Sequence, residues 1–359
     1  MGTPSGCLMP IRTFNLNFLK IKRLKTEVTI MEHIVLNTPS RLHFGLIDMN
    51  GEIGRIDGGV GLALKNPHTT IEATKSDKIQ LECAAEPEII DRLLPAVNNL
   101  CDHFRLPGAY VNIRERPLPH VGLGSATQTF VGAAHAICKL YGIQATFSEL
   151  GYLVGRGGTS GIGVAAIQSG GFIIDGGHPF RRDENSKHGY TPSSTSAGTK
   201  PPPVLSRHDF PDWDILVVVP LGEGASGLRE VTLFKVVCPV PLEQVQQMCH
   251  IIMMQMLPAV IEKDLEIFGQ AMEDFQTFGF KVFELRAQTQ LLRDCLQFLK
   301  DNGGIGVGMS SWGPAVYAFG KDLSQLHRQA NEWLDHHGGG ETILTKANNI
   351  GMHIVQEDS

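Results

Sequence analysis

The sequence predicts an α+β protein made of two domains. Its 359 residues, of which 42% are hydrophobic, are enough to bury two modest cores. In the first half, a strand pattern leads through a Pro- and Gly-rich turn into a helix, whereas the second half has long helical patterns followed by short strands. Between the halves, residues 181–203 are rich in Ser, Thr, Lys, Gly and Pro without an apolar period, which predicts a flexible segment. We therefore place an N-terminal domain at 31–203 and a C-terminal domain at 204–359.

Residues 1–30 precede the first domain and are basic. They contain neither a clean apolar core nor a small-residue cleavage site. We interpret Met31 as the natural start, or residues 1–30 as a dispensable extension that is not native, in preference to a targeting peptide.

The first domain is expected to begin with strands at 33–37 and 41–47, joined by a turn. In the second of them, Arg41 and His43 alternate with apolar residues such as Leu42, so one strand face is polar and the other buried. The further elements expected in this domain are two strands within 60–83, a helix over 86–105, a strand at 110–114, a helix from 125, a short helix over 148–156, a helix over 162–168 and a strand over 171–177.

The second domain is expected to begin with a buried strand, because 215–219 is continuously apolar. Helices packed on one antiparallel sheet would complete an α+β domain. The expected elements are a strand over 213–220, helical patterns over 241–277 and 283–301, strands over 305–308 and 314–319, a helix over 322–336 and two strands within 341–354.

The turn at 117–127 is the most distinctive stretch of the chain. Gly122 and Gly124 lack a Cβ, so the backbone there can bend tightly and a ligand can approach its N–H groups. Ser125 or Thr127 is expected to cap the following helix, whose N-terminus attracts anions such as phosphate. From glycine spacing alone, an ordinary strand-to-helix turn is an equal alternative. Neither standard nucleotide-binding fingerprint is present.

Composition limits the partners and the compartment. A formal net charge of −6 argues against a general nucleic-acid or anionic-membrane binder. No apolar run reaches the roughly 18 residues typical of a membrane-spanning helix. The seven cysteines are scattered without a C-x-x-C pair, which is typical of reduced thiols in a cytoplasmic protein. We expect no nucleic-acid or membrane partner; a homodimer is compatible with the sequence, which does not fix the oligomeric state.

Three motifs resemble those of the galactokinase, homoserine kinase, mevalonate kinase and phosphomevalonate kinase (GHMP) superfamily. The run Pro119-x-x-Gly122-Leu123-Gly124-Ser125-Ala126 is similar to the superfamily's phosphate loop. The run at 39–48 is similar to its substrate-side motif, and the Gly-rich run at 306–316 is similar to its third motif. The resemblance covers most of the chain from Met31. It implies a ribosomal-protein-S5-like N-terminal domain and a ferredoxin-like C-terminal domain.

One departure from the kinase pattern points to a different reaction. Many of these kinases carry Ser-Gly-x-Asp after the loop helix, but here Ser160 begins a run with Gly163 in place of the aspartate base. Base catalysis is worth roughly 10²–10⁴-fold in rate, and glycine cannot supply it. The run at 41–64 instead closely resembles the archaeal beta-ribofuranosylaminobenzene 5'-phosphate synthases of methanopterin biosynthesis.

This second resemblance implies a phosphoribosyltransferase on a kinase fold. Its substrates would be phosphoribosyl pyrophosphate and 4-aminobenzoate or 4-hydroxybenzoate, and its products a C-riboside 5'-phosphate, pyrophosphate and carbon dioxide. Two alternatives stay open: an ATP-dependent GHMP kinase acting on a small molecule such as a sugar or hydroxy acid, and a non-catalytic regulator on the same fold.

The expected diphosphate site combines the loop with nearby polar residues. A helix terminus contributes about 0.3–1 kcal/mol, up to roughly 2, whereas micromolar affinity needs about 8 kcal/mol. Arginine side chains and a Mg²⁺ bridging the diphosphate oxygens are therefore expected as well. The residues predicted to bind phosphate are His120, Gly122, Leu123, Gly124, Ser125, Ala126, Thr127, Arg156 and Ser160.

The resemblance also assigns candidate catalytic and metal-binding residues. Arg41 and His43 are expected to face the ribosyl or aromatic substrate; the alternatives are an exposed strand arginine and a hydrogen-bonded core histidine. Asp48, Asp57 or Glu230 would bind Mg²⁺ or stabilise the cationic ribosyl centre. We assign Asp57 and Glu230 to the catalytic set and Asp48 to the metal. The alternative for Asp48 and Asp57 is that they are ordinary turn residues.

Overall fold

A computed structural model describes Gly2 and residues 32–184, 186–192, 195–196, 198–222 and 228–355, except for the side chains of 228–230. Apart from Gly2, the predicted extension at 1–30 lies outside this part of the chain. The strands are β1 (His33–Asp48), β2 (Arg55–Lys75), β3 (Gln80–Glu82), β4 (Ala109–Glu115), β5 (Phe172–Asp175), β6 (His178–Pro179), β7 (Val204–His208), β8 (Asp214–Pro220), β9 (Ile305–Met309), β10 (Val316–Gly320), β11 (Gly340–Thr345) and β12 (His353–Val355). The helices are α1 (Ile89–Phe104), α2 (Ser125–Leu140), α3 (Phe147–Leu153), α4 (Ile162–Ser169), α5 (Leu228–Val237), α6 (Leu242–Ile251), the π-helix η1 (Ile252–Met256), α7 (Leu257–Glu262), α8 (Leu265–Phe275), α9 (Lys281–Arg286), α10 (Gln290–Asp301) and α11 (Ser324–His336).

The first sheet is built on two long antiparallel strands, β1 and β2. Its main path runs β12-β1-β2-β4-β3, with β5 and β6 attached to β2, and β7 to β5. The turn predicted near residue 38 is wrong, because β1 continues through it. The pairing of β1 with β2 shifts register at Pro39/Arg41 and again at His43/Gly45, and the two strands stay paired on both sides of each shift.

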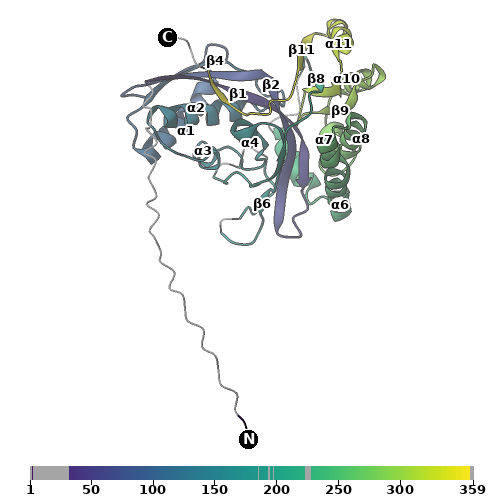
Figure 1. Cartoon of the computed structure of the whole chain (residues 1–359), viewed down its shortest axis with the longest axis horizontal. Helices are drawn as coiled ribbons and strands as arrows, with labels where there is room; N and C mark the ends of the chain where they lie inside the picture. The colour runs from purple at the N-terminus through teal and green to yellow at the C-terminus, as the bar shows by residue number, and fades with distance from the viewer. Residues whose placement is uncertain are drawn as a thin grey trace.

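Helices cover one side of these strands (Figure 1). Helix α2 packs on both β1 and β2 and also contacts α1, α3 and α4, which explains why almost all of its residues are buried. It begins at Ser125, as predicted. Because α2 is held on so many sides, the position of its N-terminus is fixed relative to the sheet.

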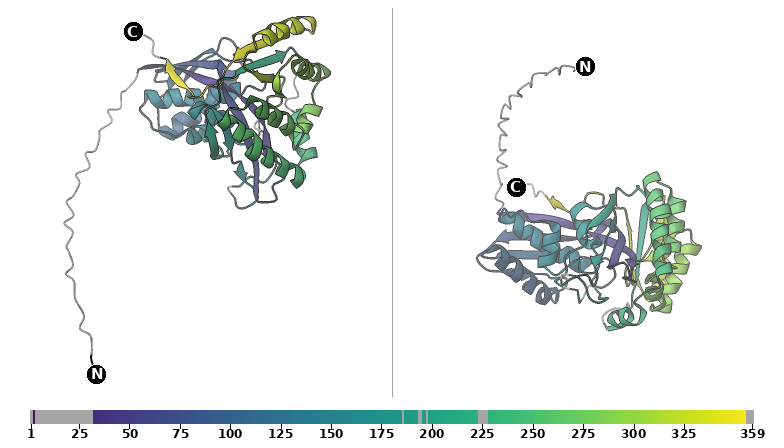
Figure 2. Two further views of the ribbon diagram at one scale, coloured as in Figure 1. Left: turned by 45° about the vertical axis from the view of Figure 1, so that its right-hand side comes forward. Right: turned by 90° about the horizontal axis from the view of Figure 1, so that it is seen from below.

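The second sheet has the order β11-β8-β10-β9 and is entirely antiparallel. Together with the intervening helices this is the ferredoxin-like arrangement that the resemblance implies. Alternate residues of β8 enter different cores: Ile215 and Val217 pack with α8, whereas Leu216 and Val218 pack with α10 and α11. Burial on both faces explains the continuous apolar run of β8. In two further views, α6–α8 and α1–α3 lie at opposite ends of the molecule (Figure 2).

The chain does not pass from the first sheet to the second at the predicted position after residue 203. Strand β7 follows that position but pairs with β5, and β12 returns from the second domain to pair with β1. Within the segment predicted to be flexible, the side chains of Lys187 and Ser196 are buried. These described residues therefore pack against the first domain instead of lying free at the surface.

Candidate active site

The three sequence motifs meet at the carbonyl group of Gly122. This oxygen accepts hydrogen bonds from Nη1 of Arg41 and from Oγ of Ser310, the latter at 2.8 Å. The Arg41 backbone N–H also donates to Leu123 O at 3.2 Å, and the His43 N–H donates to Ser310 Oγ at 3.0 Å. The first strand, the loop and the Gly-rich run of the second domain thus form one hydrogen-bonded unit.

The N-terminus of α2 opens into this unit without a side-chain cap. Gly124 occupies the N-cap position with φ 79°, and no side chain accepts from the first turn. The prediction that Ser125 or Thr127 caps the helix is therefore wrong. Thr127 Oγ1 instead accepts from Nε and Nη2 of Arg156, at 3.1 and 3.0 Å. Uncapped N–H groups at a helix N-terminus suit an anion.

A cavity of about 150 Å³ lies beside the loop and is strongly cationic. Its charged side chains are Arg41, Arg92, Arg116, Arg156 and one carboxylate, Glu86, which forms an ion pair with Arg116. Burial, and to a lesser extent a neighbouring arginine, together lower the pKa of Arg41 and of Arg156 to about 10. Both guanidinium groups remain charged at neutral pH, so this loop cavity attracts anions.

A smaller inner cavity of about 60 Å³ continues from the loop cavity. Arg41, Arg156, Ser311 and Trp312 line both, so the two are parts of one cleft. Ligand pockets typically enclose roughly 300–1,000 Å³. The inner cavity is therefore smaller than a typical ligand pocket, and the buried ring of Phe234 on α5 is one of the residues that line it.

His43 contributes an unpartnered imidazole to the inner cavity. The ring is buried, and neither nitrogen has a hydrogen-bond partner. Burial, followed by the nearby charges of Arg41 and Lys281, holds its pKa well below 6.5. The alternative of a hydrogen-bonded core histidine is therefore wrong, as is that of an exposed strand residue for Arg41, which is half-buried against the loop.

The sequence interpretation missed two charged residues at this site. Lys281 and Glu284 lie on α9 and are almost completely buried, with their Nζ and Oε2 atoms 2.9 Å apart. Lys281 Nζ also donates to Ser311 O at 2.9 Å, and Glu284 lines the inner cavity. The available signal was a lysine between two phenylalanines at 280–283, which is unusual on an exposed helix face.

Asp57, predicted to be catalytic, lies in a buried cluster outside the cavity lining. Its Oδ2 is 2.6 Å from His178 Nδ1 and 2.9 Å from Lys187 Nζ. Lys187 also donates to Gly158 O at 2.9 Å. The structure thus gives Asp57 a role in holding the segment around Lys187 against the first domain, and its catalytic role stays a prediction.

Asp175 holds the segment that begins at Ser160 in place through hydrogen bonds to its carboxylate. Its carboxylate accepts from Gly161 N at 2.9 Å, Gly177 N at 3.0 Å and Ser160 Oγ at 3.4 Å. Burial raises its pKa from 3.8 to about 6 even though these hydrogen bonds favour the ionised form. Ser160 is thereby positioned at the inner cavity.

We expect the Asp175 carboxyl to make stability fall as the pH rises from about 4 to about 6. Its pKa is raised in the folded state, so the stabilising contribution is complete below the unfolded pKa and is lost through the folded pKa of about 6. The loss is about 3 kcal/mol at 1.36 kcal/mol per pKa unit. Urea unfolding of the wild type and Asp175→Asn from pH 4 to 8 measures it as the difference between the two curves. Parallel curves would contradict the expectation; Asp335→Asn, on an exposed face of α11, is the control.

The other predicted residues fall into three groups. His120, Gly122, Gly124, Ser125 and Ala126 line the loop cavity, Thr127 and Ser160 line the inner one, and Arg156 lines both. Leu123 contributes only backbone, because its side chain is buried in the core. Asp48 Oδ1 accepts from Asn50 N and Gly51 N in a turn, and the Glu230 side chain lies outside the described residues.

The described residues do not form a preassembled Mg²⁺ site. No cluster of three or more His, Cys, Asp or Glu residues suited to a metal occurs among them. The carboxylates that line the cleft, Glu86 and Glu284, are each engaged with a cation. The assignments of Asp48 and of Mg²⁺ stay predictions.

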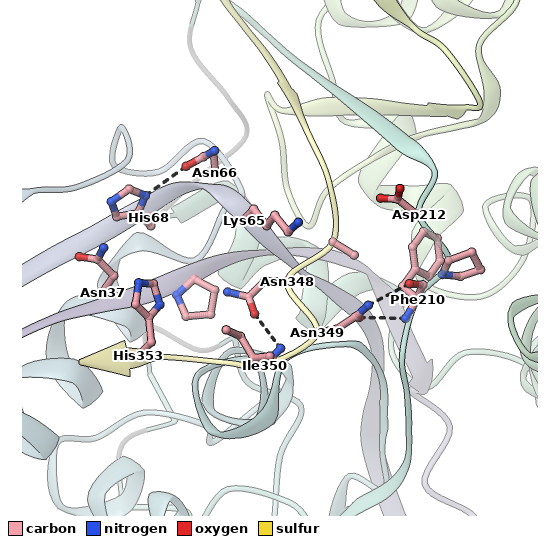
Figure 3. Close-up of a pocket in the computed structure, with 13 residues that line it drawn as sticks. Asn37, Lys65, Asn66, His68, Phe210, Asp212, Asn348, Asn349, Ile350 and His353 are labelled. Atoms are coloured by element: carbon pink, nitrogen blue, oxygen red, sulfur yellow. Dashed lines mark hydrogen bonds between the residues drawn. The ribbon is translucent and has the colours of Figure 1, made fainter. Parts of the chain in front are cut away.

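A larger cavity of about 620 Å³ lies beside β1, β2 and β12, where Pro39 at the start of the first motif lines it (Figure 3). Asn37, His68, His353 and Asn348 border it on one side and Phe210 on another. No residue of the loop and no arginine lines it. Volume alone would favour this cavity, but the arginines and the unpartnered His43 ring favour the cleft as the site for an anionic substrate.

Comparisons with known proteins agree with this geometry. The family model described as GHMP kinases C terminal matches residues 256–338. The homoserine kinase of Cytophaga hutchinsonii has a TM-score of 0.65 at 14% identity, covering 95% of this chain and 100% of its own, which shows the fold alone. A Beta-ribofuranosylphenol 5'-phosphate synthase of Methanocaldococcus jannaschii is 41% identical over 89% of this chain and 100% of its own. That of Archaeoglobus fulgidus is 42% identical over 89% and 98%.

Fold and cleft together define a two-domain protein of the GHMP kinase fold with a cationic cleft beside its glycine-rich loop. Within that class, the chain belongs to the beta-ribofuranosylphenol 5'-phosphate synthase family. The predicted fold and family are thereby confirmed. Among the described helices, none is both long and apolar enough to cross a bilayer.

Proposed function

We propose that this protein transfers the phosphoribosyl group of phosphoribosyl pyrophosphate to an aromatic acid, with release of pyrophosphate and carbon dioxide. The acceptor is 4-hydroxybenzoate or 4-aminobenzoate, and the reaction is a step of methanopterin biosynthesis. The names of the relatives, which specify a ribofuranosylphenol phosphate, favour 4-hydroxybenzoate.

The observation that carries this proposal is a cationic phosphate cleft without the kinase's proton acceptor. Gly163 lines the inner cavity against Thr127, and a Cβ built on Gly163 would lie 3.0 Å from Thr127 Cγ2. The position therefore holds no carboxylate. Arg41, Arg156 and the N-terminus of α2 remain available to stabilise negative charge on a departing diphosphate.

The chemistry then divides between the two parts of the cleft. The loop cavity holds the diphosphate, so the ribose C1 lies toward the inner cavity, beside His43. The acceptor's ring carbon attacks C1 as the C1–O bond to diphosphate breaks. Loss of carbon dioxide from the same ring carbon returns the ring to aromaticity. Close positioning of the two substrates supplies much of the rate.

Mg²⁺ stays part of the proposal as an ion held mainly by the donor's own oxygens. When bound, it would neutralise diphosphate charge alongside the arginines. The described residues offer it no preassembled site.

The test is incubation of the purified chain with phosphoribosyl pyrophosphate and each acceptor. We expect pyrophosphate, carbon dioxide and the C-riboside phosphate in equal amounts. A parallel incubation with ATP and candidate sugars or hydroxy acids measures ADP release. Substrate-dependent ADP release without pyrophosphate would instead establish the kinase.

A further inference from the structure

The proposed reaction raises a proton problem when the acceptor is a phenol. As the ring attacks C1, electron density flows from the para oxygen into the ring, and the hydroxyl proton becomes strongly acidic. A phenol hydroxyl has a pKa of about 10, so it is protonated at neutral pH before the reaction. Some group at the inner cavity must accept this proton, and the sequence did not indicate which.

His43 is poorly placed to accept it. The imidazole lies near Arg41 and Lys281, whose charges together with burial lower its pKa. A protonated His43 would be a third cation in a buried region. The ring can exchange hydrogen bonds with a substrate through its unpartnered nitrogens, but it is held neutral.

Glu284 is better suited than His43 to accept the proton of the acceptor's hydroxyl. Its side chain is 3% exposed, lines the inner cavity and lies against Lys281. Burial raises its pKa above the ordinary 4.5, which brings it closer to that of a phenol and makes it a stronger base. Among the described residues, the other carboxylate in the cleft lining is Glu86, which belongs to the loop cavity.

We propose that Glu284 accepts the para-hydroxyl proton of the acceptor and that Lys281 then pairs with the phenolate oxygen. This inference rests on the proposed function and assigns a residue to it. The O–H bond breaks first and the proton moves to the carboxylate, which leaves a phenolate beside Lys281. The ring carbon of this phenolate then bonds to C1 while the C1–O bond to diphosphate breaks, so the oxygen becomes a neutral dienone carbonyl. Electrons from the C–CO₂ bond then restore the ring, and Glu284 returns the proton to the oxygen.

This exchange avoids creating net charge in a buried region. Before transfer, Lys281 pairs with the Glu284 carboxylate; afterwards it pairs with the phenolate, while Glu284 is neutral. The number of charges is the same in both states. Separating or adding a buried charge would be costly, so a swap of partners is the favourable route.

Comparing an amine acceptor with a phenol acceptor tests whether Glu284 acts as the base. The nitrogen lone pair of 4-aminobenzoate activates the ring without losing a proton, so this acceptor does not need the base. A residue that only supports the fold, or that contacts the ribose, would affect both acceptors alike. The ratio of turnover with the two acceptors is therefore the diagnostic quantity.

The experiment compares wild type, Glu284→Gln and the control Glu273→Gln with both acceptors. Glu273 belongs to a Lys–Glu pair with Lys300 at the surface, outside the cleft. In Glu284→Gln we expect kcat with 4-hydroxybenzoate to fall about 10²–10⁴-fold and kcat with 4-aminobenzoate to fall about tenfold or less. Ring-fluorinated 4-hydroxybenzoates, whose hydroxyls are more acidic, should recover part of the loss. The control should match the wild type with both acceptors.

Equal losses with both acceptors in Glu284→Gln would overturn the assignment. Because this change leaves a buried lysine without its partner, Glu284→Asp is measured as well; it keeps the charge and withdraws the carboxylate by one methylene. If Glu284→Gln does not fold, the ratio of turnover with the two acceptors in Glu284→Asp tests the assignment instead. If the wild type releases no pyrophosphate with either acceptor, the proposed function itself fails, which is a different result from an unchanged ratio.

Discussion

Arg41→Ala is expected to lower kcat/KM for the phosphoribosyl donor by about 10²–10⁴-fold. The guanidinium lines both parts of the cleft and offers two donors to the diphosphate. Hydrogen bonds to charged groups are each worth about 1.5–3 kcal/mol, and each 1.4 kcal/mol corresponds to a factor of ten. Arg41→Lys should recover only part of the activity, because an ammonium group cannot form the bidentate contact.

The same substitution should change stability little. Arg41 loses one hydrogen bond to Gly122 O, worth about 1 kcal/mol, but its removal also relieves burial of a charge next to Arg156. Thermal unfolding with and without inorganic pyrophosphate measures both effects. Wild type should be stabilised by pyrophosphate and Arg41→Ala much less. The control, Arg328→Ala on an exposed part of α11, should retain the full shift. An unchanged shift in Arg41→Ala would remove Arg41 from the anion site.

The features that the sequence predicted well are those with a local signal. Alternation identified Arg41 and His43 as one polar strand face, and the glycines of the loop together with the apolar period after Ser125 located the start of α2. In each case the signal lies within a few residues, because a turn and a helix face are decided by near neighbours. The structure brings both to one cleft.

The features that the sequence missed depend on contacts between distant segments. Nothing near Glu284 indicates that it lies opposite β1, because only the docking of the two domains places it there. Asp57 was assigned to the site from the family resemblance, yet its described partners are His178 and Lys187. Lys187 belongs to the segment predicted to be flexible, so no pattern could have paired it with Asp57. Tertiary structure supplied these assignments.

The second large effect is expected from Gly122→Ala, because this residue joins all three motifs. Its φ is 92°, and a Cβ at this position would lie 2.3 Å from Ser310 O, which is backbone and cannot move aside easily. Its own carbonyl accepts from Arg41 and Ser310. Left-handed strain costs about 1–2 kcal/mol and forced packing about 1–3, so we expect the free energy of unfolding to fall by about 3 kcal/mol or more.

Gly338→Ala is the control that separates the cost of backbone strain from the cost of the steric collision expected in Gly122→Ala. Gly338 has nearly the same φ, 95°, but no atom lies within 4 Å of its ideal Cβ position. Urea unfolding should therefore show a loss of only about 1–2 kcal/mol for Gly338→Ala, with turnover unchanged. In Gly122→Ala the collision would push the loop away from Ser310, so turnover should fall at least about 100-fold even where the protein is folded. Equal losses of stability in the two variants would mean that the loop and the third motif are not packed as the structure describes. Normal turnover in folded Gly122→Ala would mean that the geometry of the loop does not control the reaction.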